Sequence, residues 1–456
     1  MSNYLDQQLS AMGVAQVLVA LKYQTTAAEA TQTLGKHFRV TETAPQTLIA
    51  SAMAFHKGAG AKRAAVTKPP PVRVFENLGL MLGTVDRKGL SALRADRKRV
   101  TQVTSVPILG LIRPRVRVAA AAPSLTVTWG ISELEAEELW NQGITGKGVK
   151  VGHLDTGVDG EHPALHAAIS EFAAFDLAGQ MVTPSPAAYD SGEHGTHTAG
   201  TIAGRPVDVG GSTVRIGVAP DAMLVSALVI EGGDVNMRVL GGMNWAVGKG
   251  VKVLSMSLGV PGYHEQWRPV TQILRQRGVL PVFAIGNEGP GTSRSPGNYP
   301  EALSVGAMDR NRVVADFSSS QRFLRPDDPL VPDLVGPGVD VISAKPTNAG
   351  GGFQSMDGTS MATPHIAGLA ALLFQAKPTA TLEEVENAIY ASCSGGPGLP
   401  PDRADRGFPN APRAVENLLN PPPAAEAKKS VPPRSKKPTA RKSARRGSAS
   451  KKYVRG

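Results

Sequence analysis

The sequence predicts an α/β protein whose main domain is a parallel β-sheet with helices on both faces. Short apolar runs alternate with helical segments, which is the order of strands and crossover helices in such a sheet. The runs are almost continuously apolar, as expected for strands that are buried on both sides. We expect strands at 222–230, 251–258, 279–285, 303–307 and 339–344, and helices at 235–247 and 266–277.

Length and composition indicate the number of domains and whether a membrane span is expected. The chain has 456 residues and is 41% hydrophobic, which is enough for a sizeable core, and we expect two domains and a tail in a monomer. No run of about 18 apolar residues occurs, so no membrane span is expected. The first basic residue, Lys22, follows the apolar run 14–21 rather than preceding it, unlike in a signal peptide. This pattern favours a cytoplasmic location and leaves export by another route open.

Residues 1–115 read as a small α+β unit that precedes the main domain. Its pattern predicts a strand at 16–23, a helix at 25–38, strands within 72–85, a helix at 87–98 and a strand or strand pair at 101–112. Residues 116–127 belong to a small, basic segment punctuated by proline, which is typical of an exposed linker. The main domain then occupies residues 128–420.

Ser360 lies in a stretch of glycine and other small residues that leads into an apolar helix. Gly358 allows a tight turn, and Pro364 is expected in the first helical turn, where no N–H is needed. Ser360 is therefore expected at a helix N-terminus, where unpaired N–H groups would stabilise a nearby oxyanion. A serine that only caps the helix fits this stretch equally well.

A nucleophilic serine needs a histidine base and a carboxylate that orients the base. His194 lies among small residues just before an apolar helical segment at 198–203. Asp155 follows the β-rich run 149–154, so it is expected at the C-terminal end of a buried strand, where open α/β sheets place their chemistry. These two residues are the candidates for the base and the carboxylate.

The order of the three residues separates the possible peptidase and esterase types. The α/β-hydrolase order is excluded, because no acidic residue lies between Ser360 and the last histidine, His365. The chymotrypsin order requires the many alternating strands of a β-barrel protease, which the chain lacks. The order of Asp155, His194 and Ser360 resembles the remaining known order, that of the subtilisin family.

With these motifs, the chain resembles the subtilisin family of serine peptidases, the subtilases, over about residues 129–419. A fourth segment, 281–289, is similar to the family's oxyanion strand and contains Asn287. The resemblance implies that Ser360 is the nucleophile, that Asp155 orients the base His194, and that Asn287 donates a side-chain hydrogen bond to the oxyanion. The alternative function is a binding protein built on an inactive protease fold and tethered by its basic tail.

The resemblance also implies roles for the flanking segments and for substrate binding. Residues 1–115 would be a pro-domain that aids folding and inhibits the enzyme, with self-processing in the linker 116–127; an unrelated accessory domain stays open. The residues expected to contact a polypeptide substrate are Ser257, Leu258, Gly259, Gly286 and Arg294. Arg294, if it points into the primary pocket, would favour Asp or Glu before the scissile bond, whereas a solvated arginine would have no such effect.

No cofactor is required by this interpretation. Subtilases often bind calcium in the loop that here spans 205–215, but this loop contains one carboxylate, Asp208, whereas calcium prefers several acidic ligands. Calcium is therefore possible but is not supported by the loop sequence. A zinc site at His194 and His197 is disfavoured, because the His-Glu-x-x-His pattern is absent.

The last segment, residues 421–456, differs in composition from the rest of the chain. From residue 425 onward it contains twelve Lys or Arg and one Glu, which together equal the net charge of +11 of the whole chain. Its Pro, Ser, Ala, Lys and Arg content predicts a disordered tail. Such a tail is expected either to bind nucleic acid or another polyanion, or to act only as a solubilising segment.

Overall fold

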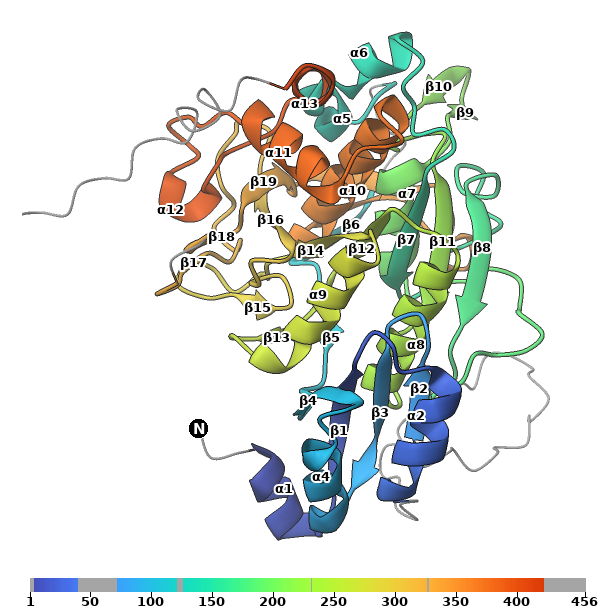
Figure 1. Cartoon of the computed structure of the whole chain (residues 1–456). Coiled ribbons are helices and arrows are strands. Elements are labelled where there is room, and N and C mark those ends of the chain that lie inside the picture. Colours follow the sequence, from blue (N-terminus) through green and yellow to red (C-terminus); the bar gives the residue numbers. More distant parts are fainter. Residues whose placement is uncertain (1–3, 40–71, 121–125, 231, 326–327, 422–456) are drawn as a thin grey trace, which may run out of the picture. The chain divides into compact units, whose positions relative to one another are not determined.

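A computed structural model describes residues 4–39, 72–120, 126–230, 232–325 and 328–421 of the chain (Figure 1). Residues 422–456 of the predicted basic tail (421–456) lie outside the described residues. No helix in the described ranges combines the length and the apolar character that a membrane crossing needs.

The main domain is built on a seven-stranded, all-parallel sheet with the strand order β19-β16-β14-β12-β7-β11-β8. The predicted fold class is thus confirmed. The strands of this sheet are β7 (Lys150–Asp155), β8 (Ile169–Ala174), β11 (Met223–Leu228), β12 (Val253–Met256), β14 (Leu280–Ala284), β16 (Leu303–Met308) and β19 (Leu334–Pro337).

Helices cover both faces of this sheet. Successive strand residues point to opposite faces, so neighbouring residues of one strand pack against different helices. Val253 packs in one apolar cluster with residues of α7 (His194–Ala203) and α10 (Thr359–Ala376), whereas Leu254 packs in another with residues of α8 (Val235–Gly248) and α9 (Arg268–Gln276). The remaining helices of the domain are α5 (Trp129–Leu134), α6 (Ala136–Asn141), α11 (Leu382–Ser392), α12 (Pro401–Ala404) and α13 (Ala411–Leu419).

The N-terminal unit is a four-stranded antiparallel sheet with helices on one face (Figure 1). Its elements are α1 (Tyr4–Met12), β1 (Ala15–Leu21), α2 (Ala27–Leu34), β2 (Val72–Phe75), β3 (Leu80–Val85), α4 (Arg87–Ala95) and β4 (Val100–Thr104). Val17 and Val19 pack with the unit's own helices, and Leu18 and Ala20 pack in the cluster that contains α8 and α9. The second face of the small sheet is therefore covered by the main domain.

Polar contacts accompany this apolar interface. The Asn77 backbone N–H donates to Oδ1 of Asn244 at 2.8 Å, and Nδ2 of Asn77 donates to the Asn244 carbonyl at 2.9 Å. Nε2 of Gln16 donates to Oδ2 of Asp234 at 2.9 Å. Asn244 belongs to α8 and Asp234 directly precedes it. The polar contacts of the N-terminal unit are therefore made with this helix and its N-terminal end.

The chain after β4 differs from the expected linker. Residues 110 and 111 form β5 (Gly110–Leu111), which pairs antiparallel with β13 (Leu258–Pro261). Residues 116–120, which were expected to be linker, form β6 (Val116–Ala120) and pair with β21 (Phe353–Asp357). The short sequence of β6 gives little strand signal of its own, and its partner lies more than 200 residues later.

Two further differences concern the strands of the main domain. The predicted strand 339–344 is β20 (Val341–Ala344), but it pairs antiparallel with β21 and lies outside the parallel sheet. Strands β8 and β19 of that sheet were not predicted. The small surface strands are β9 (Val207–Val209), β10 (Ser212–Val214), β15 (Arg294–Ser295), β17 (Gln321–Arg322) and β18 (Leu330–Val331).

Two histidines in α7 and α10 make stability depend on pH. Burial lowers the pKa of His197 to about 3 and that of His365 to about 4, although each ring donates a hydrogen bond to a backbone carbonyl. In the unfolded chain both would titrate near pH ~6.5. Between these values the unfolded chain binds more protons, so the free energy of unfolding decreases as the pH falls.

We expect the free energy of unfolding to drop by up to about 2.7 kcal/mol per pH unit between pH ~6 and ~4.5 from these two groups. Urea unfolding of the Ser360→Ala variant, which avoids self-digestion, measures this slope. The same variant carrying His166→Asn, a change at an exposed histidine, serves as the control and should keep the slope. A flat profile over this range would contradict buried, neutral His197 and His365.

Candidate active site

Asp155 and His194 lie in direct contact at the carboxyl end of the parallel sheet. Asp155 is the last residue of β7, and His194 is the first residue of α7. Nδ1 of His194 lies 2.7 Å from Oδ1 and 2.9 Å from Oδ2 of Asp155, and both residues are 1% exposed. Because an ionised carboxylate only accepts, Nδ1 carries the hydrogen of this contact, and Nε2 is the ring nitrogen left for other partners.

Burial alone would raise the pKa of the Asp155 carboxyl. The neighbouring His194, which also supplies a hydrogen bond, outweighs this effect together with His153 and the Thr156 backbone N–H, so the pKa of Asp155 lies below its ordinary value. The carboxylate is therefore ionised at neutral pH in spite of its burial.

A buried hydrogen-bond network joins the end of β7 to the start of α7. Oδ2 of Asp190 accepts from the Thr196 backbone N–H at 2.7 Å, and its Oδ1 accepts from Oγ1 of Thr156 at 2.7 Å. Oγ1 of Thr156 in turn accepts from the Gly195 N–H at 2.9 Å. Asp190 thus acts as the anionic cap of α7 and fixes the position of His194 relative to β7.

The glycine that follows His194 is required by the close approach of these two elements. A Cβ atom at Gly195 would lie 2.0 Å from the carbonyl oxygen of Gly157. Gly157 itself has a φ of +115°, which disfavours any side chain there. Close backbone packing between the segment after Asp155 and the start of α7 therefore explains Gly157 and Gly195.

Thr198 and His153 support the carboxylate from its other side. Oγ1 of Thr198 donates to Oδ2 of Asp155 at 3.3 Å and lies 2.9 Å from Nε2 of His153. Burial lowers the pKa of His153 against the opposing effect of the Asp155 and Asp190 charges, so this ring is neutral. The sequence analysis missed both residues; the only signal was a histidine within an otherwise apolar strand.

Ser360 is the second residue of α10, after the cap Gly358. The expectation that Pro364 lies in the first helical turn is wrong, because Pro364 lies inside the helix. Proline has no N–H, so the Ser360 carbonyl loses its helical partner. Oγ of Ser257 donates to this carbonyl instead, at 3.4 Å.

The hydroxyl of Ser360 is engaged by the chain's own N-terminal part. Its Oγ donates to the carbonyl oxygen of Ile112 at 2.7 Å. Nε2 of His194 has no hydrogen-bond partner among the described residues. The structure therefore brings Asp155 and His194 together and directs the Ser360 hydroxyl to a peptide carbonyl rather than to the histidine.

Asn287 is held by the residue that precedes Ser360. Its Oδ1 accepts from the backbone N–H and from Oγ1 of Thr359, both at 2.9 Å. Since a backbone N–H can only donate, this contact fixes which end of the amide faces Thr359. Nδ2 is then free to donate to the Arg113 carbonyl at 2.9 Å. Gly286, with a φ of +122°, allows the turn before Asn287.

The expected substrate-binding strand is occupied by residues 110–112. Leu258 pairs with Leu111 and Gly259 with Gly110, and the Ile112 N–H donates to the Ser257 carbonyl at 3.0 Å. This segment covers the site, which explains why Ser360 is 0% exposed. The structure thus places Ser257, Leu258 and Gly259 in backbone contact with an extended peptide.

Arg294 is neither solvated nor available as a free positive charge. Its Nη2 lies 2.6 Å from Oε1 of Glu288, and its Nη1 donates to the Gly259 carbonyl at 3.2 Å. Burial would raise the pKa of Glu288, but the hydrogen bonds and charge of Arg294 keep this pKa below its ordinary value. Both groups are therefore charged, and they neutralise each other beside the substrate-binding strand.

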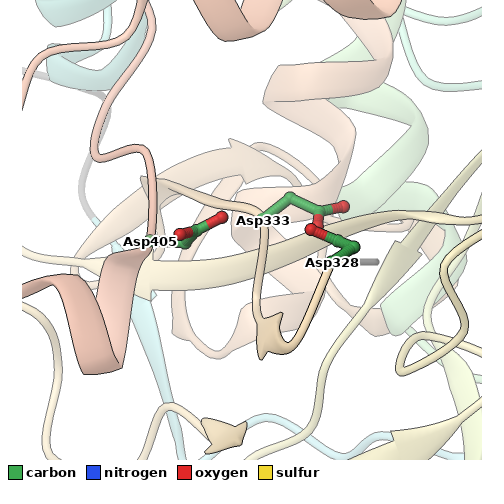
Figure 2. A group of neighbouring side chains, drawn as sticks. All are labelled: Asp328, Asp333 and Asp405. Atoms are coloured by element: carbon green, nitrogen blue, oxygen red, sulfur yellow. The ribbon is translucent and has the colours of Figure 1, made fainter. Parts of the chain in front are cut away.

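The loop at 205–215, for which calcium was considered, carries one carboxylate, Asp208. It forms the β9–β10 hairpin, and the carboxylate of Asp208 accepts from Oγ1 of Thr213 at 2.8 Å. Within the described ranges, one group of three acidic residues has ligand atoms close together: Asp328, Asp333 and Asp405 (Figure 2). The guanidinium of Arg406 lies 2.6 to 3.5 Å from all three carboxylates, so a protein cation already forms ion pairs with this group.

Comparison with known proteins agrees with this geometry. The profile of the subtilase family matches residues 146–415. M-protease of Shouchella clausii is 37% identical over 323 residues, which is 70% of this chain and 76% of that protein. Subtilisin Savinase of Lederbergia lenta is 39% identical over 58% of this chain and 90% of its own length, and subtilisin E of Bacillus subtilis is 33% identical over 67% and 75%.

The expectation of a cytoplasmic location is wrong. The subtilisins and alkaline proteases that the chain resembles are secreted, extracellular enzymes, which conflicts with that expectation. The family profile covers more than half of the chain, and the residues of all four motifs lie in or beside one site. The chain therefore belongs to the subtilase family and is a subtilisin-like serine endopeptidase that acts on polypeptides.

Proposed function

We propose that the enzyme matures itself by cutting its own chain between Ile112 and Arg113, with Ser360 as the nucleophile. The observation that carries this proposal is the Ile112 carbonyl, which lies 2.7 Å from Oγ of Ser360 while residues 110–112 pair with the substrate-binding strand. This bond lies just before the segment 116–127 in which processing was expected.

The proposed reaction uses only side chains and backbone groups of this chain. Ser360 attacks the carbonyl carbon of Ile112, and Nε2 of His194 takes the hydroxyl proton while Asp155 orients the ring. Nδ2 of Asn287 and the Ser360 N–H stabilise the oxyanion. His194 then donates the proton to the Arg113 nitrogen as the peptide bond breaks, and water releases Ile112 from the acyl-enzyme by the reverse sequence.

The neighbouring bond, Arg113–Pro114, is the alternative cut. Asn287 donates to the Arg113 carbonyl, which alone would favour this bond. The strand register favours Ile112 instead, because its N–H donates to Ser257 directly after the two paired residues Gly110 and Leu111. A movement of one carbonyl toward Nδ2 of Asn287 would complete the oxyanion contact at Ile112.

Expression of the full chain beside the Ser360→Ala variant tests this proposal. We expect the wild type to lose residues 1–112, to begin at Arg113 and to react with a fluorophosphonate probe at Ser360, and the variant to do neither. Ser91→Ala, a change at an exposed serine of α4, is the matched control and should mature normally. Intact mass and N-terminal sequencing give the result; a probe-reactive chain that stays uncut would refute self-maturation but not the catalytic assignment.

Asn287→Ala should slow self-processing without changing binding of the N-terminal unit. In subtilisin, loss of the same side-chain donor lowers turnover by about 100- to 1,000-fold, and we adopt this value as the expectation. The measurement is the rate at which residues 1–112 are lost after refolding from denaturant. Gln24→Ala, a change at an exposed amide side chain, is the control and should leave the rate unchanged. An unchanged rate would remove Asn287 from the oxyanion site.

We also propose that the Glu288–Arg294 pair sets the preference for the residue before the scissile bond. With the pair intact, the positive charge of Arg294 is compensated, and an apolar residue such as Ile112 is preferred. This preference would replace the one for Asp or Glu that the sequence suggested from Arg294 alone. The basic tail remains a proposed polyanion-binding segment, and no cofactor is proposed.

Glu288→Gln should release the charge of Arg294 and shift the preference toward acidic residues. We expect the ratio of kcat/KM for peptides with Glu against Leu at this position to rise by about tenfold, since an ion-paired hydrogen bond contributes roughly 1.5 kcal/mol or more. Glu265→Gln, which removes an exposed partner of Arg268, is the control. If the ratio stays constant, Arg294 does not reach the substrate side chain.

A further inference from the structure

The chain on the leaving-group side of Ser360 continues along the active site as a strand. After Ile112, residues 116–120 pair antiparallel with residues 357–353, in the register Val116 to Asp357 and Ala120 to Phe353. The partner strand β21 leads through Gly358 directly to Thr359 and Ser360. Strand β6 therefore occupies the positions that the residues after the scissile bond of a substrate would need.

Arginine contacts attach this strand to residues of the active site. The guanidinium of Arg115 donates to the carbonyl oxygen of Asn287, with a distance of 2.9 Å from Nε, and the Arg115 N–H donates to the Asp357 carbonyl at 2.8 Å. Nη1 of Arg117 lies 3.4 Å from the carboxylate of Glu193, the residue before His194. The strand thus contacts the neighbours of both the histidine and the oxyanion amide.

The attachment consists of backbone pairing and charge rather than apolar burial. Val116 is 45% exposed and Val118 is 55% exposed, so neither side chain contributes much to a core. The side chains in the Arg117–Glu193 pair are 43% and 28% exposed, and such a pair is weakened by salt. The strand can therefore separate from β21 without unfolding the domain.

From these contacts we propose that β6 is a second, separate inhibitory segment that stays on the enzyme after the N-terminal unit is cut off. This inference rests on the proposed cut between Ile112 and Arg113. That cut removes no contact between residues 113–120 and β21. The retained strand competes with substrate as part of the same molecule, so its effective concentration is high. The processed enzyme reaches full activity only when β6 leaves β21.

The strength of the inhibition depends on the fraction of enzyme molecules in which β6 is detached from β21. A substrate that extends beyond the scissile bond binds only to the fraction of molecules in which β6 is detached, so kcat/KM is lowered by that fraction. Added salt or a weaker strand raises the fraction. The inhibition therefore appears as a higher KM, with kcat unchanged at saturating substrate.

Two variants weaken the strand by different means. Arg117→Glu replaces attraction to Glu193 with repulsion, and Val118→Gly lowers strand stability without changing a charge. Lys252→Glu is the matched charge reversal at an exposed residue before β12, at the opposite end of the parallel sheet. We expect each of the first two variants to raise kcat/KM for an internally quenched peptide by about three- to tenfold, mainly through KM, and the control to leave it unchanged.

The experiment uses self-processed enzyme whose N-terminus has been sequenced and whose active sites have been titrated. Hydrogen exchange of the β21 amides is the second readout: these amides should be protected in the wild type and should exchange faster in both variants. Equal activity and equal exchange in enzyme that begins at Arg113 would overturn this inference alone. An N-terminus beyond Ala120 would overturn it while self-maturation stands, and an uncut chain would overturn both.

Discussion

The hydrogen bond between the Asp155 carboxylate and Nδ1 of His194 is the interaction on which the site depends. It needs a carboxylate that stays ionised although it is fully buried, because burial raises the pKa of such a group. The surrounding donors meet this need, and the capping of α7 by Asp190 keeps the histidine at the required distance. The parallel sheet contributes by ending β7 where α7 begins. Most residues around the pair therefore serve its position rather than the reaction.

The same backbone groups that would bind a substrate hold the N-terminal part of the chain. Strand β13 pairs with residues 110 and 111, and β21 pairs with residues 116–120, so the observed arrangement and the proposed reactive arrangement have most contacts in common. They differ in the hydroxyl of Ser360, which donates to a carbonyl oxygen instead of to His194. Because the proposed inhibition uses the contacts of substrate binding, changes that improve one are expected to affect the other.

The sequence predicted the parallel sheet and the motif residues because both depend on local patterns. Apolar runs marked most strands to within a few residues, and glycine-rich motifs marked Asp155, His194 and Ser360. The pairing partners of the strands could not be predicted from local patterns. For example, β20 was expected in the parallel sheet, but it pairs with β21. β8 was not predicted because it lies at the edge of the sheet and contains polar residues, so it lacks the continuous apolar run of the central strands. The strand β6 depends on a partner more than 200 residues away, which no single segment encodes. The Glu288–Arg294 pair is local, but sequence alone does not show that the two side chains meet.

If the enzyme matures itself as proposed, the small sheet of the N-terminal unit makes this activation irreversible. Its outer face, with Leu18, Ala20, Phe75, Leu80 and Leu82, is covered only by the main domain. A released unit exposes this face to water and loses the stability that the contact supplied, so it opens more often. In the proposed maturation, the released unit is the first free polypeptide that the new enzyme meets, and it is present in equal amount. A released unit that has been digested can no longer rebind and cover the active site.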